Sequence, residues 1–198
     1  MGNFSLKFDK FWETFIKYNG YVKVLEGLKN TLTIAVLGLI IGIVIGTLIA
    51  TARVIPQYKV LPRILNKICS FYVALFRGTP IVVQLLVFYY VLLPLMGSRM
   101  TGIQVAVMVF GLNSAAYISE IMRGGIMSVD SGQMEAGRAV GLSFGTTMLK
   151  IVIPQAVKNI LPTMGNELIA LIKDTSVVSF VGATDLYVAF SFIGSSNY

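Results

Sequence analysis

An apolar stretch of the chain carries polar side chains that share one face of a helix. In the run 103–123, Asn113, Tyr117 and Glu120 are separated by four and then three positions, which is the spacing of neighbours on a helix face. An amide or carboxyl group inside a membrane-spanning helix is costly when it faces lipid, so it normally faces a partner or a water-filled cavity. We therefore expect a polar path along this face, with donors and acceptors suited to a small zwitterion.

The run 158–180 presents a second face of the same kind. Thr163, either Asn166 or Glu167, and Ala170 fall at helical spacing along it. A path between the two faces needs groups on both sides, so we expect Glu167 to line it together with the residues on the first face.

Each of these polar residues also has a structural interpretation. Asn113 can hydrogen-bond across helices and contribute only to packing. Glu120 can pair with Arg123 or with the polar segment that follows it, and Glu167 can pair with Lys173. The sequence alone leaves both interpretations open.

The polar segment 130–154 separates these two runs and is the second candidate for function. Glu135, Ala136 and Gly137 place one acid beside two small residues. Such a surface lets another protein approach closely and offers it a charge partner. We expect this segment to receive a docking protein.

The same segment has the local signals of two short helices joined by a turn. Asp130 or Ser131 can cap the first helix, and Ser143 can cap the second. Gly141 allows a sharp turn between them. A short, rigid helix held crosswise between two spans can act as a lever that transmits movement to both.

Composition excludes several functional classes. The chain has no histidine and a single cysteine, Cys69, which removes histidine-dependent nucleophiles and histidine zinc motifs. No Gly-x-x-x-x-Gly-Lys-Ser/Thr phosphate loop is present, so ATP hydrolysis by this chain is not expected. The net charge of +7 is spread between apolar runs, which does not indicate a nucleic-acid partner. We expect no enzyme, no bound metal and no resident cofactor.

Hydropathy predicts an all-α polytopic membrane protein. Apolar residues make up 56% of the chain and charged residues 13%, against roughly a quarter charged in typical soluble domains. Four runs approach the roughly 20 residues that cross a bilayer as a helix. These predicted spans are 28–52, 70–96, 103–123 and 158–180. The second contains Pro80, and we expect its helix to recruit residues that precede this proline.

The segment 1–26 has a different pattern of apolar and charged residues from the predicted spans. Aromatic and apolar residues recur in it at helical spacing with charged residues between them, which is typical of an amphipathic helix in the membrane interface. The apolar positions are Phe4, Phe8, Phe11, Trp12, Phe15 and Ile16. Packing against other protein is the alternative.

The distribution of basic residues predicts the orientation. The stretch 53–67 carries four basic residues and no acid, so by the positive-inside rule it is cytoplasmic. The turn 97–102 is then outside, the segment 123–158 is cytoplasmic, and both chain ends are outside. Five lysines before residue 30 oppose this orientation.

At this point a family resemblance becomes specific. The segment 130–154 resembles the cytoplasmic EAA loop of ABC importer permeases, in which E-A-A is followed after three residues by Gly and after nine more by I-x-L-P. Here Glu135-Ala136-Gly137 is followed by Gly141 and then by Ile151-Val152-Ile153-Pro154. Gly137 replaces the third-position alanine and Ile153 replaces leucine.

Other motifs resemble the polar amino-acid branch of that family. Phe76-Arg77-Gly78-Thr79-Pro80 with Gln84, the stretch Asn113–Tyr117 followed by Glu120 and Arg123, and Lys173-Asp174-Thr175-Ser176 are similar to its signatures. The resemblance implies a type I ABC importer transmembrane domain over 27–198. It also implies docking of an ATPase on Glu135, Ala136, Gly137 and Gly141, and a gate or anchor role for Arg77 and Pro80.

The resemblance further implies partners. These are two copies of a cytoplasmic ATPase that carries ATP and Mg²⁺, a second permease subunit, identical or paralogous, and an extracytoplasmic amino-acid-binding protein. The protein is expected to be multi-pass in a bacterial cytoplasmic membrane and to move polar or charged amino acids by alternating access. Such permeases carry a fifth span, which we expect to be missing after the fourth. The alternative is an ion-coupled carrier or channel that works without an ATPase.

Overall fold

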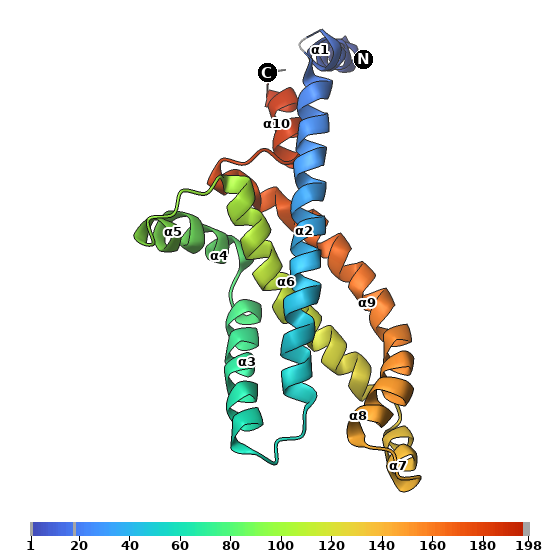
Figure 1. Cartoon of the computed structure of the whole chain (residues 1–198). Helices are drawn as coiled ribbons and strands as arrows, with labels where there is room; N and C mark the ends of the chain where they lie inside the picture. The colour runs from blue at the N-terminus through green and yellow to red at the C-terminus, as the bar shows by residue number, and fades with distance from the viewer. Residues whose placement is uncertain (1, 18, 196–198) are drawn as a thin grey trace.

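The structure is a computed structural model that describes residues 2–17 and 19–195, and the regular elements in that part are helices (Figure 1). The predicted all-α class is confirmed for it, whereas residues 1, 18 and 196–198 of the predicted domains lie outside the described residues. Two π-helical turns, Phe88–Leu92 and Met148–Val152, and a 3₁₀ segment, Thr175–Val181, join the α-helices. The α-helices are α1 Gly2–Ile16, α2 Gly20–Val54, α3 Val60–Gly78, α4 Ile81–Val87, α5 Leu93–Leu95, α6 Gly102–Met127, α7 Ser131–Ala139, α8 Phe144–Thr147, α9 Ile153–Asp174 and α10 Leu186–Ser195.

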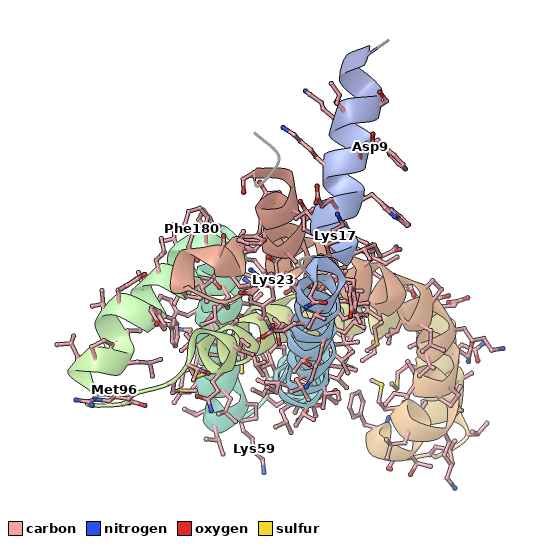
Figure 2. The ribbon with its side chains drawn as sticks, turned by 90° about the horizontal axis from the view of Figure 1, so that it is seen from above. Asp9, Lys17, Lys23, Lys59, Met96 and Phe180 are labelled. Atoms are coloured by element: carbon pink, nitrogen blue, oxygen red, sulfur yellow. The ribbon has the colours of Figure 1, made fainter. Side chains whose placement is uncertain are left out.

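The N-terminal helix ends at Ile16, the last apolar position of the predicted pattern. Asn19 adopts a left-handed conformation with φ 55°, which ends the helical path and lets a new helix start at Gly20. Residues 20–26 therefore belong to the long helix α2 and not to the amphipathic segment. Helix α1 projects from the bundle in Figure 2 and exposes Phe8 and Trp12. The side chain of Phe4 lies outside the described part.

Helices α2 and α6 form the central pair of the bundle. A Cβ atom placed on Gly42 would stand 2.7 Å from Ser114 Oγ, and one on Gly46 would stand 2.9 Å from the Ala115 carbonyl oxygen. Gly38, on the same face, is less tightly packed, with a Cβ position 3.3 Å from Phe110 Cβ. The glycines spaced four apart on α2 are thus the surface on which α6 packs at short distance.

The predicted span 70–96 is two helices. Helix α3 and the arm formed by α4, the first π-turn and α5 meet at 105°, with an extended Thr79 between them (φ −122°, ψ 144°). Pro80 disfavours a helical conformation for the residue before it and lacks the N–H that a continuing helix uses. In Figure 2 the arm extends sideways to Met96.

Two described helices, α2 and α6, are long and apolar enough to cross a membrane singly, and the number rises to four if each of two bent pairs is one span. The predicted fourth span, 158–180, lies inside the helical stretch Phe144–Val181, which meets α10 at 61°. Both ends of the described chain lie together in Figure 1, opposite α7 and the α2–α3 connection. The side of the membrane on which each loop lies stays a prediction.

Candidate functional site

A cavity of about 480 Å³ lies where the bend between α3 and α4 faces α6 and α9. Its lining contains one guanidinium, two carboxyl groups, an amide and a phenol. The lining residues are Arg77, Gly78, Thr79, Pro80, Ile81, Asn113, Tyr117, Glu167, Ala170, Leu171 and Asp174.

Most residues predicted for the path meet in this cavity. Asn113 and Tyr117 of α6 face Glu167 of α9 across it, and Arg77 and Pro80 join them from the bend. Asp174 was not among the residues predicted for the path. The helical period could have found it, because it lies two turns beyond Glu167 on the same face of α9.

Gln84 builds the bend that forms one wall of the cavity. Its Nε2 donates to the carbonyl oxygens of Phe76 (2.8 Å) and Thr79 (3.0 Å), and its Oε1 accepts from Asn113 Nδ2 (3.0 Å). The first two carbonyls belong to the α3 end, where Pro80 supplies no N–H. The buried Gln84 amide therefore replaces helical hydrogen bonds and links the bend to α6. The sequence indicated this residue only as part of a motif.

Glu167 is held by a hydroxyl group. Its Oε1 accepts a hydrogen bond from Ser114 Oγ at 3.0 Å. The pairing with Lys173 that the sequence offered as an alternative is not among the ion pairs of the described residues. The carboxyl group thus remains part of the cavity lining without a cationic partner from the described chain.

Glu120 lies outside the cavity lining and forms ion pairs with a cluster of arginines. Its carboxylate pairs with Arg53 from the end of α2, with Arg123 one turn later on α6 (2.8 Å), and at longer range with Arg77 (3.9 Å). The Glu120 side chain is only 17% exposed. This is the structural interpretation of Glu120, extended to two arginines that are distant in sequence.

Arg77 belongs to both groups of residues. Its guanidinium lies over the Tyr117 ring, 5.2 Å from the centroid, a distance at which a cation–π interaction is effective. Since Arg77 also lines the cavity and approaches Glu120, it connects the cavity to the arginine cluster.

The segment 130–154 has the predicted local structure. The Asp130 carboxylate accepts from the Gly132 amide (2.8 Å) and caps α7, and Ser143 Oγ accepts from the Thr146 amide (3.2 Å) and caps α8. Between them Gly141 has φ +86°, which favours glycine. The two predicted caps and the predicted turn are confirmed.

Gly137 has a packing reason that the sequence did not reveal. It is buried against Thr147, and a Cβ atom in its place would stand 2.9 Å from Thr147 Oγ1 and closer still to the threonine methyl group. Alanine, which the EAA pattern carries here, requires Thr147 to move. Glu135 and Ala136 are exposed on α7, so an approaching protein can reach both.

Comparison with known proteins assigns the chain to a family. The family described as "Binding-protein-dependent transport system inner membrane component" matches residues 38–195. The arginine transport system permease protein ArtQ of Bacillus subtilis (strain 168) is 39% identical over 175 residues, which cover 88% of this chain and 78% of ArtQ. The putative glutamine transport system permease protein GlnP of Rickettsia bellii (strain RML369-C) is 37% identical over 188 residues, covering 94% and 84%.

A solved structure agrees with these sequence relatives. A crystal structure of an amino acid ABC transporter with histidines superposes with a TM-score of 0.80 and 32% identity, covering 93% of this chain and 89% of the other. The polar cavity, the capped segment before α9 and these similarities all agree. The chain belongs to the binding-protein-dependent transport family and is the inner-membrane permease component of an amino-acid ABC importer, distinct from its ATPase.

Proposed function

We propose that the cavity is this subunit's section of the amino-acid path. The observation that carries the proposal is the convergence of Asn113, Tyr117 and Glu167, polar residues predicted from the sequence to line the path, with Arg77 on one cavity. A zwitterion needs an anionic and a cationic partner together with hydrogen-bonding groups, and these side chains supply all of them.

The charge of the cavity favours cationic amino acids among the polar substrates. Two carboxyl groups, Glu167 and Asp174, face one guanidinium, that of Arg77, in the lining. A substrate with a second positive group can pair with both acids while Arg77 takes its carboxylate. An anionic side chain has no second cation to meet.

The segment 130–154 is the proposed coupling site for the ATPase. Exposed Glu135 and Ala136 offer the contact surface, and Val140, which is 77% exposed, adds an apolar contact beside them. Helix α7 lies at the end of the molecule away from both chain ends (Figure 1). ATP and Mg²⁺ then bind to the ATPase partner and not to this chain.

The complete importer contains two ATPase copies, a second permease subunit and an extracytoplasmic binding protein. The cavity opens between helices of a thin bundle, so a second permease, identical or paralogous, completes its wall. Alternating access requires the ATPase to bind one permease conformation more tightly than the other, since equal affinity shifts no equilibrium. Helix α1, with Phe8 and Trp12 exposed, rests in the membrane interface.

Thiol labelling tests the path in the assembled importer. After Cys69→Ser removes the single native cysteine, Ala170→Cys places a thiol in the cavity lining. A charged, membrane-impermeant thiol reagent is expected to modify it, because the reactive thiolate forms only where water reaches the thiol. The transported amino acid is expected to slow this reaction at least about fivefold.

Ile169→Cys is the matched control, one position earlier on α9. Ile169 is 58% exposed and is not part of the cavity lining. We expect its thiol to show no protection by amino acids. Equal protection at both positions, or none at Ala170→Cys, contradicts the proposed path.

A further inference from the structure

Ser114 stands directly behind the acid of the cavity. It follows Asn113 on α6 but is fully buried and absent from the cavity lining. Its Oγ donates to Glu167 Oε1 at 3.0 Å. Thus one carboxylate oxygen is bound from the protein side, while Glu167 still lines the cavity.

Helix α2 fixes Ser114 from the opposite side. A Cβ atom on Gly42 would stand 2.7 Å from Ser114 Oγ and 2.8 Å from its Cβ, so only glycine permits this close approach. The hydroxyl is confined between α2 and α9. Backbone packing therefore fixes the position of the hydroxyl group, and its hydrogen bond fixes the orientation of the Glu167 carboxylate.

The partners of Glu167 differ in kind from those of Glu120. Glu120 is paired with arginines, whereas Glu167 takes part in none of the ion pairs of the described residues. A carboxylate oriented by a neutral donor keeps its charge available for a cation that arrives in the cavity. This combination suits a binding group better than a structural one.

We propose that Ser114 is a positioning residue, which orients the Glu167 carboxylate toward a positively charged group of the bound amino acid. The inference rests on the proposed function, in which the cavity is the substrate path. The cation is either the α-ammonium group, common to all amino acids, or a cationic side chain. Either cation donates N–H hydrogen bonds to a carboxylate, and the binding test below distinguishes the α-ammonium group from a side-chain cation.

The test measures equilibrium binding of radiolabelled L-arginine and L-glutamine to the purified permease–ATPase complex without its binding protein. Ser114→Ala is expected to raise the Kd for arginine about fivefold to tenfold, as one positioning hydrogen bond is lost. An unchanged Kd for glutamine assigns Glu167 to the side-chain cation, whereas an equal rise assigns it to the α-ammonium group.

A double-mutant cycle separates positioning from packing. If Ser114 acts through the charge of Glu167, Ser114→Ala changes the Kd little in a Glu167→Gln background. Ser119→Ala is the control: Ser119 is also fully buried on α6, but its hydroxyl bonds to the Ala116 carbonyl of its own helix (2.8 Å). We expect it to leave both Kd values unchanged.

The outcomes distinguish the inference from the proposed function. The inference is overturned if Ser114→Ala leaves both Kd values unchanged, or weakens binding by the same factor with and without the Glu167 charge. The path itself fails, and the inference with it, if the parent binds neither probe or if Glu167→Gln leaves both affinities as they are.

Discussion

Glu120→Gln is expected to lower the stability of the permease by about 3 kcal/mol, because it removes the shared anion of a partly buried cluster. Arg53, Arg77 and Arg123 then face one another without a carboxylate among their described ion pairs. For a chain of this length the loss corresponds to a fall in unfolding temperature of about 6–12 °C. Thermal unfolding of the purified complex in detergent measures it.

Two further variants make this expectation specific. Glu13→Gln removes the acid of an exposed pair with Lys17 and should change the unfolding temperature little, since surface pairs contribute at most about 1 kcal/mol. Arg53→Met in the Glu120→Gln background should recover part of the loss, because it removes an unpaired charge. A stable Glu120→Gln variant with altered substrate preference would instead place Glu120 in the path.

Glu135→Arg is expected to abolish ATP-driven transport by preventing the ATPase from docking. Glu135 is exposed on α7, beside the small residue Ala136, so a reversed charge meets the partner directly. Losing a desolvated charge contact at an interface costs about 2–5 kcal/mol, or roughly 30-fold to several-thousand-fold in affinity. Co-purification of the ATPase with the membrane-inserted variant measures the effect.

Gln133→Arg supplies the matched control for charge. It introduces the same positive group on another face of α7, at an exposed position. We expect it to retain the ATPase. If Glu135→Arg still binds the ATPase while Gln133→Arg does not, then docking uses the other face of the helix and the proposed contact is wrong.

Much of the fold could be predicted because long apolar runs and local caps are properties of short stretches of sequence. The Asp130 and Ser143 caps and the Gly141 turn needed no information from distant residues. Family membership also decides between the two transport mechanisms that the sequence left open, since the relatives are ABC importer permeases and not ion-coupled carriers.

The remaining features depend on contacts between distant residues. We expected the helix to continue through Pro80, but the chain bends there by 105°, and Gln84 holds the bend through its bond to Asn113 on another helix. Arg123 was visible as a partner of Glu120 because it lies one turn away. Arg53, 67 positions earlier in the chain, was not.

The most direct test of the whole account is uptake of radiolabelled arginine, lysine and glutamine into vesicles that contain the complete importer with its binding protein. We expect uptake only when ATP is supplied on the side of the membrane that carries the ATPase. In Glu167→Gln we expect uptake of the cationic amino acids to fall at least about tenfold while the ATPase stays bound. Uptake that proceeds without ATP, or that is the same in Glu167→Gln for every amino acid, would contradict it.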